Sequence, residues 1–282
     1  MSQSTYTLDE LMIAAMAREL RGEYLVSAVT AFGLLAALVA QGTHAPDLDV
    51  LATPESGMGA RPWPSVSLGQ VIGLSQGAVP LSMEEIFDAI FQDRFRIWIN
   101  PAQIDRHGNV NITAIGPWEK PKVALVGSRG IPEDSSHLSQ MLYYLLQHSP
   151  RTVVEAVDFR SGAGYSRERE QSLGRAGAPS VLITNLGVFD FEGPDHTLRA
   201  RSLHPGVSPE DVRQASGCAV WIPDDVAVTP EPTPEVVSLI RAADPLGLRH
   251  WEWKPDPARL AALWQGERAE LDPFRPEARR WR

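Results

Sequence analysis

The stretch YLVSAVTAFGLLAALVAQGTHAPDLDVLAT, residues 24–53, indicates how the chain folds. Its β-rich start, residues 24–29, is followed by a turn at Gly33 and by an Ala- and Leu-rich segment, residues 34–41, that is typical of a buried helix. Strand character returns at residues 49–53. A strand, a helix and a second strand in this order form a crossover unit, which places the two strands parallel in one sheet.

The rest of the chain predicts further elements of the same kinds. Thr7 and Glu10 form a capping-box pattern that begins a helix over residues 8–20. We expect buried strands at residues 95–99, 122–126, 152–158 and 181–185, and helices at residues 139–147 and 235–243. The expected fold class is therefore α/β, with an open, mixed, mostly parallel sheet flanked by helices.

The composition limits the classes of function. A net charge of −9 over 282 residues provides no basic face for a phosphate backbone, so nucleic acid is not an expected partner. The apolar run from Tyr24 to Ala40 is shorter than the roughly 20 residues that span a bilayer, which argues against a membrane anchor. Cys218, the only cysteine, cannot form an internal disulfide, and no Cys/His spacing resembles a zinc site. Because the N-terminus also lacks signal-peptide features, we expect a cytoplasmic protein without a bound metal.

Glu55 follows the second strand of the crossover unit, in the sequence TPESGMG at residues 53–59. Loops after the strands of an open α/β sheet are where chemistry is usually placed. A carboxylate there can act as a nucleophile toward an acyl group or as a general base toward water. The tripeptide Glu-Ser-Gly also occurs in ordinary solvated turns, so these residues alone leave a structural role open.

Four short motifs follow one another in the first half of the chain: THAPD at 43–47, ESG at 55–57, AQIDRHGNVN at 102–111 and GSRG at 127–130. Together they resemble the β subunit of heteromeric class I CoA-transferases of the glutaconate CoA-transferase type. Four later motifs are VEAVD at 154–158, SGAGY at 161–165, NLGVFDF at 185–191 and GPDH at 193–196. These are similar to a branch of the same superfamily that contains bacterial CoA-dependent hydrolases opening the last steroid ring.

The resemblance covers roughly residues 8–250. It implies a CoA-transferase β-type α/β domain at residues 1–254, followed by a C-terminal extension of unknown role at residues 255–282. Family members build their active site from two subunits. The resemblance therefore implies a separate α subunit, in an αβ or α2β2 heteromer that acts on acyl-CoA and a carboxylic acid.

The resemblance also implies a role for Glu55, which matches the nucleophilic glutamate of the family members that transfer CoA. This carboxylate would take CoA from an acyl-CoA as a glutamyl-CoA thioester and pass it to a free carboxylic acid. Coenzyme A would be part of the substrate, and no tightly bound cofactor is expected. In the hydrolase branch, Glu55 or a carboxylate of the α subunit would instead position water to open a cyclic β-diketone ring carried on CoA.

Gly127, Ser128, Arg129 and Gly130 form the expected binding loop. Glycines let backbone N–H groups approach an anion closely, and an arginine can pair with a carboxylate or phosphate, although a tight turn with a solvated arginine is equally compatible with the sequence. Asn100 stands with Pro101 where relatives carry a Gly-containing turn. Pro101 has no N–H, so Asn100 would have to supply an oxyanion donor from its backbone or side chain, or the reaction differs.

Two alternatives remain open from the sequence. His196 and His204 are acid–base candidates, but each lies in a Gly/Pro-containing loop, where a histidine with a structural role is commoner. The departure from the family pattern at Asn100 also leaves open that the chain is a scaffold subunit without catalytic residues of its own.

Overall fold

The computed structural model describes residues 6–22, 24–27, 30–51, 82–166, 171, 179–244 and 247–254. Within these ranges, eight strands form one sheet in the order β13-β12-β11-β10-β8-β3-β1-β2. Their bounds are β1 Leu25–Ser27, β2 Asp49–Leu51, β3 Phe95–Ile99, β8 Met141–Leu145, β10 Pro179–Thr184, β11 Gly187–Asp190, β12 Arg199–Leu203 and β13 Ala227–Val228. The strands β2, β1, β3, β8 and β10 run parallel, whereas β11 is antiparallel to both of its neighbours. The expected mixed, mostly parallel sheet is confirmed.

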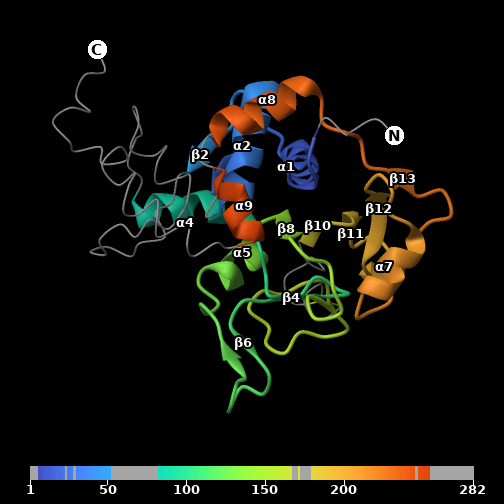
Figure 1. Ribbon diagram of the computed structural model, residues 1–282. Helices are drawn as coiled ribbons and strands as arrows, with labels where there is room; N and C mark the ends of the chain where they lie inside the picture. The colour runs from blue at the N-terminus through green and yellow to red at the C-terminus, as the bar shows by residue number, and fades with distance from the viewer. Residues whose placement is uncertain are drawn as a thin grey trace, which may run out of the picture.

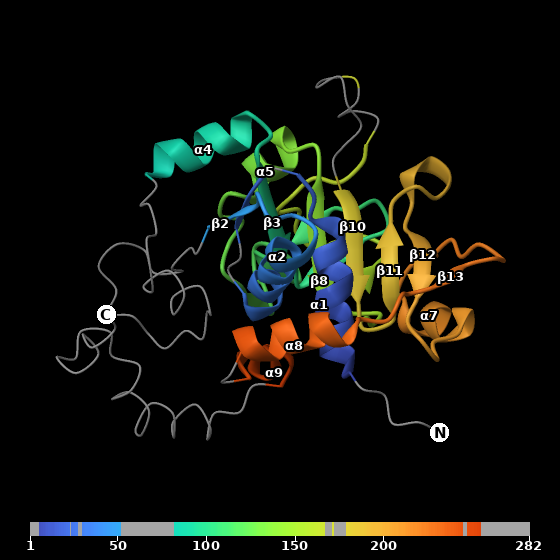
Figure 2. The same ribbon diagram turned by 90° about the horizontal axis from the view of Figure 1, so that it is seen from above.

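Helices cover both faces of this sheet (Figures 1 and 2). On one face lie α1 (Leu8–Glu19), α2 (Ala31–Thr43), α8 (Pro234–Ala243) and α9 (Leu248–Trp253). On the other lie α4 (Met83–Phe91) and α5 (Ile131–His137), while α7 (Pro209–Ala215) stands beside β12 and the edge strand β13. Each face has its own hydrophobic core, because successive strand side chains point to opposite sides.

N-cap residues determine where the first two helices on this face of the sheet begin. The Thr7 N–H donates to Glu10 Oε2 at 2.9 Å, which confirms the capping box before α1. The Thr30 hydroxyl accepts from the Gly33 N–H at 3.4 Å, and α2 accordingly begins at Ala31, three residues earlier than expected. No helix in the described ranges combines the length and the apolar character that a membrane crossing needs.

The sequence-based prediction was wrong for two segments. Residues 139–147 contain the central strand β8 and not a helix, because MLYYL is buried on both faces of the sheet and therefore shows no polar period. Residues 122–126 are not a buried strand. Only Val123–Ala124 (β7) pairs, with Ala114–Ile115 (β6), in an exposed hairpin that projects away from the main sheet (Figure 1).

A second, smaller sheet lies between this hairpin and the main sheet. It joins β5 (Val110–Asn111), β4 (Gln103–Asp105) and β9 (Val153–Val154), so the strand expected at residues 152–158 is much shorter than predicted. After β3 the chain passes through residues 100–102 and enters the smaller sheet at β4. These three residues are therefore held by the main sheet at one end and by the smaller sheet at the other.

The direction of winding reverses between β1 and β3. From β1 the chain passes through α2, on one face, to β2; the later helix α4, on the opposite face, leads to β3 on the other side of β1. In open α/β sheets, ligands bind outside the carboxyl ends of the strands at such a topological switch point. The ends of β1 and β3 therefore mark the place where a site is expected.

Candidate functional site at the switch point

Asn100 directly follows β3 and is exposed at the carboxyl edge of the sheet. It lies beside Tyr144 on the neighbouring strand β8, since Ile99, one residue earlier, pairs with Tyr143. Pro101 supplies no backbone donor here. The exposed side-chain amide of Asn100 is a donor group at the switch point.

Tyr144 contacts two other elements. Its buried hydroxyl lies 2.7 Å from Thr30 Oγ1, at the start of α2, and hydrogen-bonds the carboxylate of Glu252 in α9. Burial and the nearby charge of Glu252 raise the pKa of Tyr144 well above its ordinary value, so the phenol stays protonated. Because a carboxylate only accepts hydrogen bonds, the phenolic proton is directed at Glu252.

Glu252 reaches this position from the last helix that the structure describes. Its Oε2 accepts the N–H of Phe32, in the first turn of α2, at 3.1 Å. The N-terminus of a helix stabilises a negative charge, both through its free N–H groups and through its dipole. Phe32 also stacks on Tyr144, with ring centroids 5.9 Å apart. Three elements thus hold the carboxylate at the edge where β1 and β3 end.

The predicted binding loop, Gly127 to Gly130, links β7 to α5. Gly127 has φ 88° and Arg129 has φ 50°, both in the left-handed region, which explains the glycine at position 127. The Ser128 hydroxyl lies 2.9 Å from Thr113 Oγ1. Arg129 is exposed and forms no ion pair with any described residue. Its guanidinium group is therefore available to an anion from outside the described part of the chain.

Asn100 and the loop are linked indirectly. The Ala102 N–H donates to the carbonyl oxygen of Asn111 at 2.9 Å, and the Asn111 side chain accepts from the Thr113 N–H at 2.9 Å. Thr113 then contacts Ser128. No hydrogen bond between described residues joins Asn100 directly to residues 127–130, and Glu55 lies outside the described residues.

The motif at residues 102–111 forms a turn with a structural role. Asp105 Oδ1 accepts the N–H groups of His107 and Asn109, each at 3.0 Å, and Gly108 adopts φ 79°. The Asn109 side chain accepts the Gly164 N–H at 2.9 Å. The turn thereby joins two of the sequence motifs that lie far apart in the chain.

The two candidate histidines occupy structural positions. His204 is 2% exposed; its ring nitrogens lie 3.0 Å from Thr229 Oγ1 and 2.9 Å from the carbonyl oxygen of Thr184. Burial lowers the pKa of His204 to about 4, so the ring is neutral near pH 7. His196, in the 3-10 helix Pro194–His196, stacks on Tyr165 at 4.6 Å.

Sequence reasoning missed three polar residues: Tyr144, Glu252 and Asp134. Asp134 lies one turn beyond Gly130 in α5 and is 4% exposed; burial, together with the charge of Glu133, raises its pKa to about 7. No short motif surrounds any of these residues. Only the packing of segments far apart in the sequence reveals them, because Tyr144 and Glu252 are separated by 108 positions.

An open, doubly wound sheet with polar side chains gathered at its switch point is typical of an α/β enzyme domain that binds its ligand there. No protein-family model matches the chain. The chain is 36% identical over 234 residues to the cholesterol ring-cleaving hydrolase IpdB subunit of Mycobacterium tuberculosis, covering 82% of this chain and 91% of that protein. It is 32% identical over 249 residues to the β subunit of the 3-oxoadipate CoA-transferase of Pseudomonas knackmussii, covering 86% and 94%.

A solved structure agrees with these relatives. The crystal structure of Rhodococcus jostii RHA1 IpdAB superposes with a TM-score of 0.72 at 32% identity, covering 88% of this chain and 99% of that chain. The chain belongs to the class I CoA-transferase family, among its β subunits. The resemblance seen in the sequence motifs is confirmed, and the chain is an enzyme subunit of that family.

Proposed function

We propose that the chain is the β subunit of a two-subunit enzyme that acts on CoA thioesters at the carboxyl edge of the main sheet. The observation that carries this proposal is the gathering of polar side chains at the switch point, where the exposed Asn100 follows β3 and Tyr144 and Glu252 lie beside the N-terminus of α2. An N–H donor at that edge can stabilise the oxyanion that develops when a thioester carbonyl is attacked. The relatives that are single subunits of heteromeric enzymes, and the IpdAB pair, support a separate α subunit as the partner.

The proposed reaction is CoA transfer through Glu55. The carboxylate of Glu55 attacks the thioester carbonyl and expels CoA thiolate, which leaves a mixed anhydride. The thiolate then attacks the glutamyl carbonyl of the anhydride, releasing the donor carboxylate and forming a glutamyl-CoA thioester. An acceptor carboxylate reverses both steps, leaves with the CoA and regenerates Glu55.

The other predicted site residues have supporting roles in this proposal. Asn100 donates to the oxyanion of each tetrahedral intermediate, a contribution typically worth about 2.7–4 kcal/mol per donor. Gly127 to Gly130 offer backbone N–H groups, and the exposed Arg129 pairs with a substrate carboxylate or a CoA phosphate. CoA remains part of the substrate.

A second candidate is ring-opening hydrolysis of a cyclic β-diketone carried on CoA. The 36% identity to the IpdB hydrolase subunit favours it. In that reaction Glu55, or a carboxylate of the α subunit, positions a water molecule and removes its proton while the water oxygen adds to a ring carbonyl carbon. The adjacent carbon–carbon bond then breaks, leaving a carboxylic acid and an enolate, and the proton returns to the enolate carbon. The same edge of the sheet and the same Asn100 donor serve both reactions.

One experiment distinguishes the two reactions. The chain is purified with an α subunit of this family and incubated with acyl-CoA, and the peptide containing Glu55 is analysed by mass spectrometry. Transfer predicts a CoA adduct on Glu55, turnover that requires an acceptor carboxylic acid, and loss of both in Glu55→Gln. The exposed Glu119→Gln is the matched control and retains activity.

Hydrolysis predicts a different result: no adduct, no need for an acceptor acid, and one ¹⁸O atom from labelled water in the product. Full turnover by the Glu55→Gln complex would contradict a nucleophilic role for Glu55. Full turnover by the purified chain without an α subunit would contradict the two-subunit site.

A further inference from the structure

We propose that Ser161 and Thr113 are positioning residues, which orient the hydroxyl group of Ser128 as a donor to an anionic oxygen of the substrate. The three side chains form a line of hydroxyl groups that ends in the binding loop at residues 127–130. The inference rests on the proposed function, because it assigns a ligand to that same loop. The ligand is a carboxylate or a phosphate group, the two kinds of anion that the neighbouring Arg129 can pair with.

The spacing of the three hydroxyl groups is the first argument. Thr113 Oγ1 lies 2.7 Å from Ser161 Oγ and 2.9 Å from Ser128 Oγ, so Thr113 stands between the two serines. The Ile112 N–H donates to Ser161 Oγ at 2.9 Å, and Ser161 is 2% exposed. One end of the line is therefore buried and already receives a backbone donor, whereas the other end lies on the half-buried Ser128.

The direction in which the hydroxyl groups donate is the second argument. Each hydroxyl group has one proton, and Thr113 Oγ1 is the only acceptor that the described residues offer to the Ser161 proton. The reverse order would leave that proton buried without an acceptor, which costs free energy. Ser161 thus donates to Thr113, and Thr113 donates to Ser128. The Ser128 proton is then available to a ligand, because the described part of the chain offers it no other acceptor.

The backbone around this line is held in place, which is the third argument. The Gly127 N–H donates to the carbonyl oxygen of Ile112 at 3.2 Å, directly before Ser128. At the other end of the loop, a Cβ atom on Gly162 would lie 2.5 Å from Ile131 Cγ2, so the SGAGY motif packs closely against the start of α5. The segments that carry Thr113 and Ser161 therefore hold the loop on both sides of Ser128.

The first test measures kcat and KM for the complex with the α subunit. Ser128→Ala is expected to raise KM roughly 10-fold or more with kcat little changed, because it removes a hydrogen bond to a charged group that is made before and during the reaction. Thr113→Val and Ser161→Ala are expected to raise KM less, and Thr113→Ser should keep most of the wild-type affinity. In the Ser128→Ala background, Thr113→Val is expected to cause no further rise, since both positioning residues act through Ser128.

The same kinetics identify the anion, because S-acyl-pantetheine lacks the phosphate groups of acyl-CoA. If a CoA phosphate binds Ser128, the rise in KM is confined to acyl-CoA. If a carboxylate binds there, the rise appears with both thioesters or in the KM for the acceptor acid. Ser136→Ala is the matched control and should retain the wild-type KM, since the Ser136 hydroxyl donates to the carbonyl oxygen of Pro132 at 2.6 Å. Equal KM values in wild type and Ser128→Ala for every substrate would overturn the inference.

A second readout does not need activity. The complex is titrated with inorganic phosphate and with acetate while the amide resonances of residues 127–130 are followed. At least one of these anions is expected to bind, and to bind more weakly in Ser128→Ala and Thr113→Val than in wild type. No binding in wild type, or equal binding in all three proteins, would overturn the inference. A complex that binds the anion in this way but does not turn over acyl-CoA would overturn only the proposed function.

Discussion

Asp134 is a buried carboxyl group whose pKa is raised to about 7, and it makes the stability of the protein depend on pH. In the unfolded chain the same group has its ordinary pKa near 3.8. Between these values the folded state holds the proton more tightly, so the free energy of unfolding falls as pH rises from about 4 to about 7. The change is at most about 1.4 kcal/mol per pH unit.

The variant Asp134→Asn removes this dependence. We expect it to raise the free energy of unfolding at pH 8 by more than about 1 kcal/mol and to leave it nearly unchanged at pH 4, measured by urea denaturation at both pH values. Asp211→Asn is the matched control, because its carboxylate is exposed and its pKa is lowered by the Ser208 side chain and N–H. The control Asp211→Asn should lower the free energy of unfolding at pH 8. A loss of stability in Asp134→Asn at pH 8 would contradict the raised pKa.

Gly164 is a position where no larger residue fits. A Cβ atom there would lie 2.1 Å from the carbonyl oxygen of His107 and 2.5 Å from the Asn109 nitrogen, both backbone atoms of the structured turn. We expect Gly164→Ala to destabilise the protein by about 1–3 kcal/mol or more, seen as a lower melting temperature. Gly42→Ala, in α2, is the control: its Cβ meets only Leu239 at 3.5 Å, and stability should be retained or increased. Equal melting temperatures for the two variants would refute the steric argument.

At the residue scale the sequence was most informative where a helix end or a family motif is marked by a few neighbouring residues. It predicted the capping box of Thr7 and Glu10, which is confirmed, and Asn100 as a departure from the family, which lies at the switch point. It could not predict that Glu252 contacts Tyr144 beside Asn100, since such contacts depend on the packing of distant segments. The roles of Glu55 and Arg129 remain predictions.

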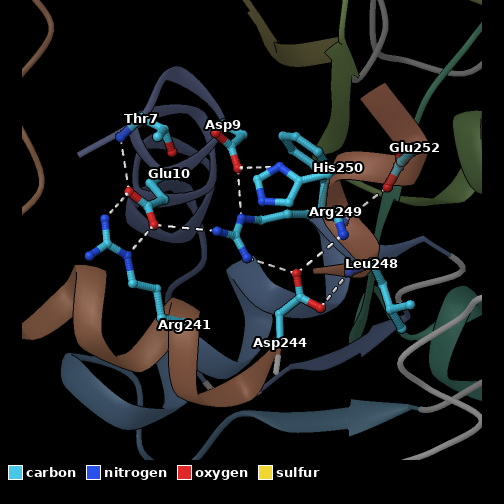
Figure 3. A network of polar contacts seen from close by, with 10 residues as sticks. Thr7, Asp9, Glu10, Arg241, Asp244, Leu248, Arg249, His250 and Glu252 are labelled. Carbon is cyan, nitrogen blue, oxygen red and sulfur yellow. Dashed lines mark hydrogen bonds and ion pairs between the residues drawn. The ribbon is translucent and has the colours of Figure 1, made fainter. Parts of the chain in front are cut away.

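Helix α9 illustrates how an element depends on its neighbours. Six residues are too few for a stable helix in isolation, but Asp244 accepts the N–H groups of Leu248 and Arg249 at 2.7 and 3.2 Å. Arg249 contacts Asp9 at 2.6 Å, Asp244 at 2.8 Å and Glu10 at 3.4 Å (Figure 3), and we call these four residues the Arg249 cluster. Burial raises the pKa of Glu10, yet hydrogen bonds from Arg241 and Thr7 outweigh burial and lower the pKa overall. Ion pairs with α1 and with the end of α8 thus stabilise a helix that is too short to be stable alone.

The variant Arg249→Met tests this anchoring. The Arg249 side chain is 7% exposed, so its removal leaves buried carboxylates without their shared partner. We expect a loss of about 3–5 kcal/mol in the free energy of unfolding, measured by urea denaturation. Arg213→Met is the control: Arg213 is 56% exposed and lies 3.7 Å from Glu210, and its loss should cost less than about 1 kcal/mol. A loss of similar size in both variants would show that the Arg249 cluster does not anchor α9.

The elements that the sequence predicted well are those with a period or a cap. Helix α1 was predicted from its apolar spacing and the Thr7 cap and is confirmed; α2 and α8 are confirmed as helices, with α2 beginning three residues earlier than predicted. Strand β8 was taken for a helix because a strand buried on both faces has no period to reveal it. The β6–β7 hairpin was missed because Val123, Leu125 and Val126 are apolar and yet exposed.

At the scale of the whole molecule, the order of strands explains why one edge carries the candidate site. Parallel strands end at the same edge, and the reversal between β1 and β3 sends the connections that leave them to opposite faces, through α2 after β1 and through α5 before β8. The sequence predicted the fold class from one crossover unit and from its motifs. It did not predict where the winding reverses, because strand order depends on pairing between segments that are far apart.

The contact between Glu252 and Tyr144 has a consequence for how the protein matures during synthesis. The ribosome delivers β1, β3 and β8 long before residues 248–253, so the sheet can assemble while Tyr144 still lacks its contact with Glu252. Completion of the switch point therefore trails assembly of the sheet, because it waits for residues 248–253 to emerge.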